Sequence, residues 1–297
     1  MRSENILPVR AKAGVSTALI TALVGLFALI MVSPLFVVLA TAFKTDAEVA
    51  LASFSWLPRR FSLDNFKKVL SMGSWGRYFY NSLVVTVATV AGSLVFNSLA
   101  GYTFARMRFR GKNFLFLLIM LGMMIPPQAI VIPQFVILRS VPFLGGNDWM
   151  GQGGIGLLNT NWALIIPFLS GSFGIFLCRQ FYTSFPKELD EAARIDGCGS
   201  FGIYARIFLP MSKQILATLC ILKTAATWND FFYPLIMTQQ EEAKTVQLAL
   251  QMFKGTTSTH WNWLMAGTLL TMIPVVIVFL CAQKYFVAGI AHAGMKN

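Results

Sequence analysis

The stretch PKELDEAARIDGCGSFGIYARIFLP, residues 186–210, is polar in a chain whose residues are otherwise mostly apolar. Pro186 suits the first turn of a helix, and the acidic residues that follow it complement the positive end of the helix dipole. The predicted helix runs to Ile195, because Gly197 and Gly199 then interrupt it. The stretch is therefore expected to begin with a short helix that ends in a glycine elbow.

A second short helix is predicted after the elbow. Ser200 is suited to be the N-cap of a helix from Phe201 to Leu209, and Pro210 is expected to stop that helix. Two short polar helices of this kind are typical of a segment that another protein grips outside the membrane. An ordinary amphipathic loop would show the same pattern, so the pattern alone leaves both interpretations open.

The residue types and their spacing resemble the EAA loop of binding-protein-dependent ABC importer permeases. The resemblance rests on Glu191, Ala192 and Ala193, then on Asp196 and Gly197, and finally on the run Ile207, Phe208, Leu209 and Pro210. In that family the loop forms coupling helices that sit in a cleft of the ATPase subunit. The resemblance implies that Glu191, Ala192, Ala193, Asp196, Gly197, Leu209 and Pro210 couple this chain to a separate ATPase.

Two further segments resemble the carbohydrate-uptake branch of that family, the group of the shorter maltose permease subunit. They are WNDFFYPL, residues 228–235, and YFVAGI, residues 285–290. The resemblance implies an all-α membrane protein with the six transmembrane helices of the type I ABC importer permease fold. It also implies three partners: a dimer of ATP-binding cassette ATPases, a second homologous permease subunit, and an extracytoplasmic solute-binding protein.

The composition places the chain in a membrane. Of its 297 residues, 56% are hydrophobic and 12% are charged, with a mean hydropathy of +0.64, whereas soluble domains carry about 25% charged residues. The net charge of +12 is spread over short loops rather than gathered in one stripe, so lipid headgroups explain it better than nucleic acid.

Six stretches are apolar over about the 20 residues that a bilayer core requires. They are roughly 14–42, 80–105, 114–138, 160–182, 213–238 and 263–284. We expect one permease domain over residues 1–297, with an N-terminal span at 14–42, core spans within 80–284, the coupling loop at 186–210 and a C-terminal tail at 285–297. The tail resembles the family's segment that inserts at the ATPase dimer interface.

Charge in the loops predicts the orientation. Arg106, Arg108, Arg110 and Lys112 lie in the short link between the second and third spans, which the positive-inside rule makes cytoplasmic. The loop at 186–210 and both termini are then cytoplasmic, in a multi-pass protein of the bacterial inner membrane. The first outer loop is also basic and disagrees, but the shorter and denser cluster decides.

The third span contains Pro126, Pro127 and Pro133, with Gln128 nearby. Proline in a spanning helix frees backbone carbonyls, which need partners in protein or in a water-lined cavity rather than in lipid. Pro126 and Gln128 are therefore candidates for the lining of a solute pathway. A kink that serves packing alone is the alternative.

The fifth span carries Lys223 inside an apolar run and Asp230 two turns later on the same face. A charge at mid-bilayer costs about 2.5–3.5 kcal/mol on insertion scales, so it should face a cavity or a partner. Lys223, Trp228 and Asn229 are therefore pathway candidates, and Lys223 favours a polar or anionic solute. The alternative is a structural bond from Lys223 to Asp230 or to a helix carbonyl.

Trp261 and Trp263 flank the start of the last span. In the maltose system the corresponding loop is thought to contact the binding protein, so the two tryptophans are candidates for that contact. Tryptophans at a span boundary also serve as membrane-interface anchors, and this alternative stays open.

Several classes of function are not supported by the sequence. Gly151, Gly153 and Gly156 spell GxGxxG without a preceding strand and are expected to form a flexible loop, and no GxxxxGK[ST] occurs. No metal site is signalled, because the cysteines lack CxxC spacing. ATP and magnesium are therefore expected on the partner ATPase, with no cofactor in this chain.

The sequence thus predicts a transport subunit rather than an enzyme: the permease of an ABC importer for a sugar or oligosaccharide, paired with a homologous subunit as a heterodimer. A permease for another polar solute, such as glycerol phosphate or an acidic saccharide, is the alternative. A secondary transporter would need repeated halves and coupling-ion carboxylates within the spans, and only Asp230 lies within one.

Overall fold

The computed structural model describes residues 7–51, 55–255 and 258–294, and side chains from residue 17 to 281 and at Gln283. The regular secondary structure of this part of the chain is helical apart from one isolated bridge between Lys254 and Thr259. The helices are α1 (Leu7–Ala42), α2 (Asp46–Ala50), α3 (Asp64–Ser71), α4 (Trp75–Arg106), α5 (Lys112–Met124), α6 (Pro127–Arg139), α7 (Asn161–Ile165), η1 (Ile166–Phe168), α8 (Ser172–Thr183), α9 (Glu188–Ile195), α10 (Ser200–Ile203), η2 (Tyr204–Phe208), α11 (Leu209–Met211), α12 (Lys213–Trp228), α13 (Phe232–Met237), η3 (Glu241–Ala243), α14 (Val246–Ala249), η4 (Leu250–Phe253) and α15 (Trp261–Gly294).

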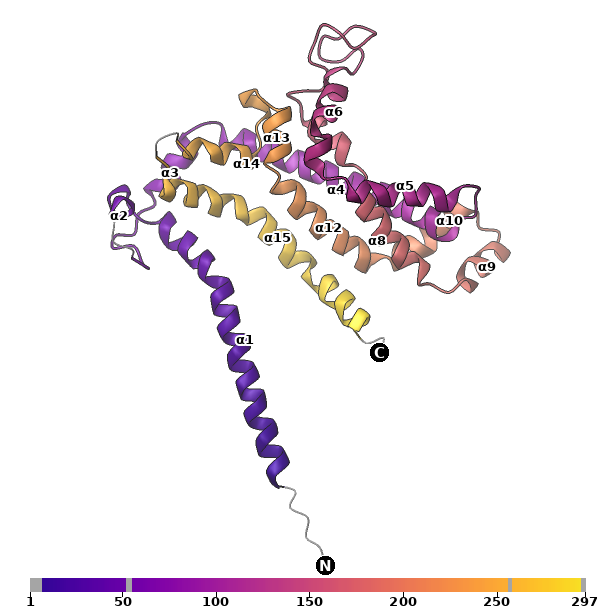
Figure 1. The fold of residues 1–297 in the computed structure, drawn as a ribbon, viewed down its shortest axis with the longest axis horizontal. Helices are drawn as coiled ribbons and strands as arrows, with labels where there is room; N and C mark the ends of the chain where they lie inside the picture. The colour runs from indigo at the N-terminus through magenta and orange to yellow at the C-terminus, as the bar shows by residue number, and fades with distance from the viewer. Residues whose placement is uncertain (1–6, 52–54, 256–257, 295–297) are drawn as a thin grey trace, which may run out of the picture. The chain divides into compact units, whose positions relative to one another are not determined.

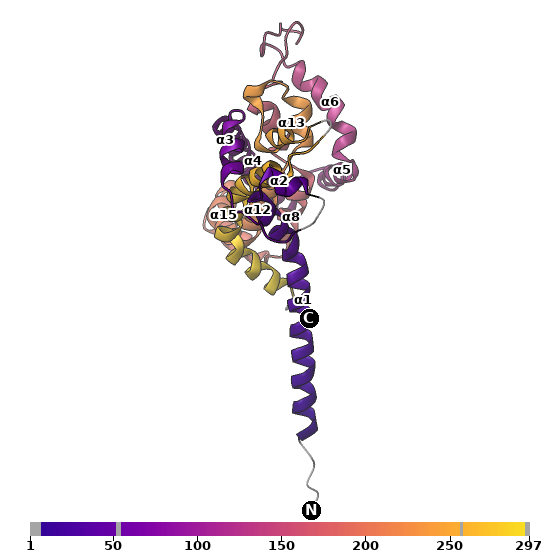
Figure 2. The ribbon, with the colours of Figure 1, turned by 90° about the vertical axis from the view of Figure 1, so that its left-hand side faces the viewer.

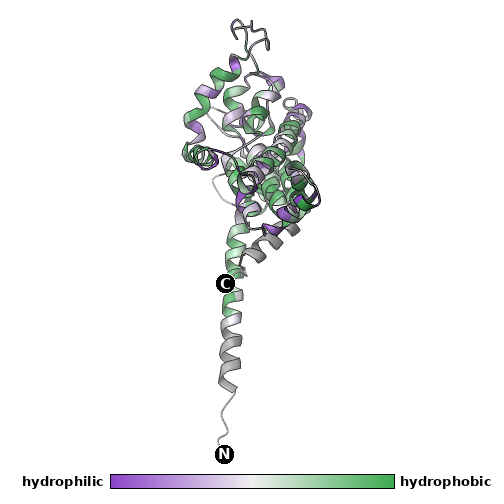
Figure 3. Cartoon of the chain, turned by 90° about the vertical axis from the view of Figure 1, so that its right-hand side faces the viewer, coloured by the Kyte–Doolittle hydropathy of each residue, from purple (hydrophilic) through white to green (hydrophobic). Residues whose placement is uncertain are grey.

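Four helical segments of the described chain are long and apolar enough to cross a membrane without a sharp bend: Thr17–Ala42, Trp75–Arg106, Asn161–Thr183 and Trp261–Cys281. Two further pairs reach that length only as bent spans, Lys112–Met124 with Pro127–Arg139 and Ser200–Met211 with Lys213–Trp228. The all-α fold is confirmed, with six spans when each bent pair is counted as one. Figure 3 shows the apolar residues along these helices.

The third span is broken more strongly than a kink. Its two halves, α5 and α6, meet at 105°. Ile125 and Pro126 are both extended, with ψ angles of 119° and 134°, because a residue before proline is driven out of the helical region. Each of these two residues precedes a proline, so the pair of prolines ends one helix and starts the next.

The fifth span also differs from the prediction, since 213–238 is not one helix. Helix α12 ends at Trp228, and α13 begins at Phe232. Pro234 has no N–H to donate to the carbonyl of residue 230, and Asn229 Nδ2 donates to the Ala225 carbonyl at 2.9 Å. Both effects favour a new helix after residue 230 over continuation of the old one.

The described chain packs as two compact units. One comprises Met1–Met72 with Phe253–Leu270, and the other comprises Gly73–Met252 with Thr271–Asn297. The expectation of a single permease domain over 1–297 stays a prediction. The tail at 285–297 lies outside the described side chains, and its residues 295–297 lie outside the described chain altogether.

In the larger unit, α4 runs beside α8 and α12, as Figure 1 shows. Two apolar clusters hold this bundle together. One joins Val85 of α4 to Val131 of α6 and Tyr233 of α13. The other is aromatic and joins Tyr102 of α4 to Tyr182 of α8 and Phe208 of η2. The short helices α9 and α10 lie at one end of the bundle, and α6 and α13 lie at the other (Figure 1).

The smaller unit is held by a polar cluster in which Asn65 and Asn262 are buried and Asp46 is exposed. Asn262 Nδ2 donates to Asp46 Oδ1 at 2.7 Å and to Asn65 Oδ1 at 3.0 Å. Asn65 Nδ2 in turn donates to the carbonyls of Ala42 and Lys44, at 2.8 and 2.7 Å. These bonds join the end of α1 to α3 and to the start of α15. The hydrogen bond from Asn262, and after it the one from Lys68, lower the pKa of Asp46 from its ordinary value of 3.8.

The glycine-rich segment between α6 and α7 has a defined conformation. Asn147 is buried; its Nδ2 donates to the Arg139 and Val141 carbonyls, and its Oδ1 accepts from Gly154 N at 2.8 Å. Asp148 Oδ1 accepts from the backbone N–H groups of Met150 and Gln152. The expectation of a flexible loop did not anticipate this network. The loop projects beyond α6 (Figure 1 and Figure 2).

Candidate functional site

The polar loop at 186–210 is built on helix α9, which begins at Glu188, two residues later than predicted. Its end is a Schellman motif: Gly197 N donates to the Arg194 carbonyl at 3.0 Å, and Cys198 N donates to the Ala193 carbonyl at 2.9 Å. Gly197 has φ +79°, a conformation that favours glycine. The predicted elbow is therefore present, and Gly197 is the residue that makes it.

Arg106, the last residue of α4, holds this loop against the bundle. Its Nε donates to Asp190 Oδ2 at 2.8 Å, and Nη2 forms an ion pair with the same oxygen. The guanidinium also donates to the carbonyls of Phe185 and Pro186, and it lies 5.1 Å from the centroid of the Phe208 ring. The pair is almost fully buried, with side-chain exposures of 6% for Arg106 and 13% for Asp190. One side chain thus fixes the start of α9 and its contact with η2.

The second helix of the loop does not stop at Pro210. Helix α10, the π-helical turn η2 and α11 run on without interruption from Ser200 to Met211, and Gly199 rather than Ser200 is the N-cap. Pro210 lacks the N–H that a regular α-helix would donate to the carbonyl of residue 206, and a wider π turn before it accommodates that loss. Ser212 ends the segment, and its hydroxyl donates to the Phe208 carbonyl.

The loop presents one face to the surroundings. Glu191, Ala192, Asp196, Gly197 and Pro210 are exposed, whereas Leu209 is half-buried and Ala193 packs among the aromatic cluster. Two large apolar side chains that the sequence analysis did not single out are also exposed.

These side chains are Ile195, 87% exposed, and Phe201, 70% exposed. An acidic helix that carries exposed apolar side chains beside a glycine elbow is a surface suited to binding another protein.

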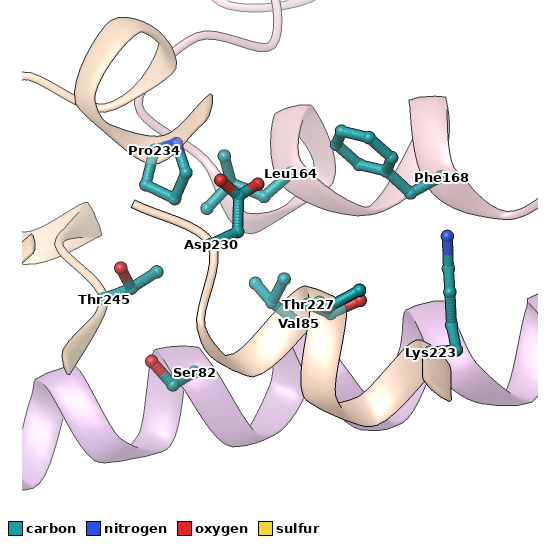
Figure 4. Close-up of a pocket in the computed structure, with 10 residues that line it drawn as sticks. Ser82, Val85, Leu164, Phe168, Lys223, Thr227, Asp230, Pro234 and Thr245 are labelled. Carbon is teal, nitrogen blue, oxygen red and sulfur yellow. The ribbon is translucent and has the colours of Figure 1, made fainter. Parts of the chain in front are cut away.

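A second candidate site is a cavity of about 80 Å³ between α4, α12 and the α7–η1 segment. Its lining includes Ser82, Val85, Leu164, Phe168, Lys223, Ala226, Thr227, Asp230, Pro234 and Thr245. Figure 4 shows Lys223 pointing toward Phe168 at one end, and Asp230 beside Leu164 and Pro234 at the other. The volume holds a few water molecules and is below the roughly 300–1,000 Å³ typical of complete ligand pockets.

Lys223 and Asp230 face this one cavity without pairing with each other. No ion pair within 4.0 Å joins them among the described residues. Lys223 Nζ lies 5.4 Å from the centroid of the Phe168 ring. Asp230 Oδ1 accepts from Tyr233 N at 3.2 Å and so caps the start of α13. The structural alternative of a Lys223–Asp230 bond is therefore not seen.

The other pathway candidates lie apart from the cavity. Pro126 and Gln128 are exposed at the bend between α5 and α6. Trp228 is buried, donates from Nε1 to the Thr271 carbonyl at 2.9 Å and packs against Phe79. Asn229 is exposed and accepts from Gln247 Nε2 at 3.1 Å. Trp228 thus joins α12 to α15, and the pathway roles of these residues stay predictions.

The two tryptophans at the start of α15 differ in surroundings. Trp261 is 51% exposed. Trp263 is partly buried and stacks on His260 with ring centroids 4.1 Å apart, while Lys68 Nζ lies 5.1 Å from its ring centroid. Trp261 is therefore the freer of the two for a partner or for lipid, and both contacts stay predictions.

Sequence reasoning missed the positioning residues of both sites. Arg106 was assigned only to the cytoplasmic charge cluster, although an arginine at the end of a long span and an acid in the first turn of a loop helix are a recognisable pair. Ser82 of α4 lies far along the chain from Lys223, Thr245 follows after α13, and no local pattern connects either residue to Lys223.

Comparison with known proteins gave consistent findings. A family model described as "Binding-protein-dependent transport system inner membrane component" matches residues 93–292. The chain is 36% identical over 274 residues to the "Probable ABC transporter permease protein YurM" of Bacillus subtilis, covering 92% of this chain and 86% of that protein. It is 32% identical over 273 residues to the "Arabinooligosaccharides transport system permease protein AraQ" of Halalkalibacterium halodurans, covering 91% and 93%.

The fold is also found among solved structures. A chain of a bacterial ABC transporter involved in the import of the acidic polysaccharide alginate superposes with a TM-score of 0.77. The match covers 96% of this chain and all of the other at 24% identity, so it is a likeness of fold.

Proposed function

Because the chain belongs to the family of binding-protein-dependent transport system inner membrane components, we propose that it is the permease subunit that carries a sugar or oligosaccharide through an ABC importer. It is a multi-pass protein of the inner membrane. Its work is alternating access rather than covalent chemistry. In this proposal, ATP hydrolysis on another polypeptide reorients the spans that surround the solute.

The observation that carries the proposal is the anchored loop at 186–210. Transmission of a movement requires a rigid lever with an accessible face, and the Arg106–Asp190 pair supplies the rigidity. Glu191, Ile195 and Phe201 supply the accessible face. Because α12 follows α11 directly in the chain, a displacement of the loop is passed to the helix that carries Lys223.

The partners follow from this proposal. A dimer of ATP-binding cassette ATPases binds the loop at 186–210. ATP and Mg²⁺ bind to that ATPase dimer rather than to this chain. A second, homologous permease completes the pathway as a heterodimer, and an extracytoplasmic solute-binding protein delivers the solute. Both termini are cytoplasmic, as the bases between α4 and α5 favour.

A saccharide is the solute that the relatives support, since the name of AraQ specifies arabinooligosaccharides. The alternative of an acidic saccharide or glycerol phosphate rested on Lys223. That argument is weakened because Asp230 lines the same cavity and offsets the charge of Lys223.

The coupling role is tested by reversing one charge on the exposed face of α9. Glu191→Lys should insert normally but lose association with the ATPase and lose uptake, because an acidic contact becomes a repulsive one. Glu188→Lys is the matched control, since Glu188 is also exposed but lies in the first turn of the same helix. The measurements are co-purification with the partner ATPase of the importer and ATP-driven uptake in liposomes. Wild-type association and uptake in Glu191→Lys would show that the coupling assignment is wrong.

A further inference from the structure

The cavity beside Lys223 combines four kinds of group that recognise a polyhydroxylated ring. It contains a cationic donor, a carboxylate acceptor, hydroxyl groups and the face of an aromatic ring. Figure 4 shows these groups arranged around one space rather than in contact with one another. Hydroxyl groups of a sugar both donate and accept, so a site for them needs both kinds of partner.

The charges of the lining balance. Lys223 and Asp230 are its charged residues, of opposite sign, and they do not form an ion pair in the described structure. The Asp230 carboxylate accepts from Tyr233 N and also interacts with the backbone N–H of Phe232, while a carboxylate has about four hydrogen-bonding positions. An anionic solute would meet Lys223 but also the Asp230 carboxylate, whereas a neutral one can use both.

Two hydroxyls near Asp230 are available for hydrogen bonding. Thr245 is 5% exposed, and its Oγ1 has no hydrogen-bond partner in the described part of the chain. Ser82 Oγ accepts from Val246 N at 2.9 Å, which leaves its own O–H to donate. A buried hydroxyl without a partner carries a desolvation cost that a ligand hydroxyl can remove.

The space of about 80 Å³ is too small for a whole sugar ring in its own pocket. It is large enough for one edge of a ring whose remainder lies outside the cavity. The Phe168 ring at the Lys223 end provides an apolar face for the C–H groups of such an edge.

We propose, resting on the saccharide-import function above, that this cavity binds the hydroxyl edge of a neutral saccharide, with Lys223 donating and Asp230 accepting hydrogen bonds. Thr245 supplies a hydroxyl at the Asp230 end. The cavity thereby selects neutral sugar rings against rings that carry a carboxylate.

The test uses the whole importer, with its ATPase, second permease and binding protein, in proteoliposomes. The probes are neutral arabinotriose and maltotriose and the same two sugars oxidised to a terminal uronic acid, each supplied at equal concentration. Uptake is normalised to assembled complex. Lys223→Met should lower uptake of the neutral sugar by about tenfold or more, since a hydrogen bond to a charged group is lost.

Two variants separate the donor role from the charge. Lys223→Gln keeps a donor without a charge, so it should retain more neutral-sugar uptake than Lys223→Met. Asp230→Asn keeps the oxygen that caps α13 and removes the charge. It should lower neutral-sugar uptake and raise the ratio of uronate to neutral uptake. Lys213→Met, at the exposed start of α12, is the matched control and should transport as the wild type does.

The outcomes are distinguishable. No ATP-driven uptake of any saccharide by the wild type would overturn the proposed function itself. Wild-type import together with unaffected Lys223→Met and Asp230→Asn variants would overturn only the cavity assignment. If Lys223→Met lost uptake of the uronates alone, the cavity would be a site for an anion rather than for a neutral saccharide. If Lys223→Met assembles poorly, Thr245→Val removes the unpartnered hydroxyl at nearly constant shape, and undiminished neutral-sugar uptake there would equally reject the proposal.

Discussion

Arg106 is the residue on which the loop at 186–210 most depends. By the positive-inside rule, positive charge in the link between α4 and α5 favours a cytoplasmic position of that link. Arg108, Arg110 and Lys112 supply the same charge as Arg106. Arg106 differs because its guanidinium is buried and reaches Asp190 and two backbone carbonyls. Its planar fork of donors satisfies all of these acceptors at once, which lysine would not do.

Removal of this side chain should destabilise the loop. Arg106→Met leaves the Asp190 carboxylate buried and unpaired, and breaking a buried pair in this way costs about 3–5 kcal/mol. We expect a lower thermal midpoint in detergent and faster proteolysis within 186–210. Arg108→Met is the control, because it removes one base from the same link and alters no bond described for Arg108.

Asp190→Asn in the Arg106→Met background should restore part of the stability, since the unpaired charge is then gone. Equal thermal midpoints for Arg106→Met and Arg108→Met would mean that the buried pair does not stabilise the loop.

At the scale of elements, proline has different effects at different places in this chain. The pair at Pro126 and Pro127 breaks the third span by 105°, whereas Pro210 is absorbed in a helix by a π turn. The difference lies in the residue before each proline: Ile125 and Pro126 are extended, while Leu209 keeps helical angles of −61° and −46°. Tertiary packing of Phe208 in the aromatic cluster keeps the second segment helical.

The loop between α6 and α7 is an element held by one amide. Asn147→Ala removes three hydrogen bonds from a buried position, at roughly 1 kcal/mol net each. The loop should then open locally, and a protease added to the purified protein in detergent should cut within 140–158 faster than in the wild type.

Gln152→Ala is the control for that loop, because Gln152 is exposed and its described bond to Asp148 comes from the backbone. Unchanged cleavage in Asn147→Ala would mean that the left-handed glycines hold the loop without the amide.

At the scale of the whole molecule, long-range polar contacts join segments that the chain separates widely. Asn262 donates to Asp46, 216 residues away, and to Asn65, 197 residues away. The smaller unit is therefore held by a polar cluster as well as by apolar packing. Buried amides of this kind specify one arrangement, because any other leaves their hydrogen bonds unsatisfied.

The cluster predicts a pH dependence of stability. The pKa of Asp46 is lowered by Asn262 and then by Lys68. A lowered folded-state pKa gives stability that is present above the ordinary value of 3.8 and is lost as the pH falls through the lowered value. We expect the thermal midpoint of the purified protein to fall as the pH drops below about 4.

Asp46→Asn should lower that midpoint at neutral pH and reduce its further fall in acid. Asp64→Asn, which removes an exposed carboxylate from α3, should keep the acid-induced fall of the wild type. An identical pH profile of the thermal midpoint for Asp46→Asn and the wild type would show that Asp46 does not cause the loss of stability in acid.

The sequence by itself determined the class of molecule, the approximate spans and the position of the loop at 186–210. The length of an apolar run and the density of charge in a loop are local properties of the sequence. The thickness of the bilayer and the positive-inside rule act on these properties directly. The glycine elbow was equally predictable, because the left-handed conformation at Gly197 depends on that residue's own backbone.

The tertiary structure alone decided which polar residues meet. Ser82, Lys223 and Thr245 come from three elements, and no periodicity relates them. Packing also decided that Lys223 and Asp230 share a cavity without a salt bridge, and that Arg106 is an anchor rather than one more surface base. Sequence spacing specifies positions along a helix or strand, whereas contacts between elements depend on how the whole apolar core is filled.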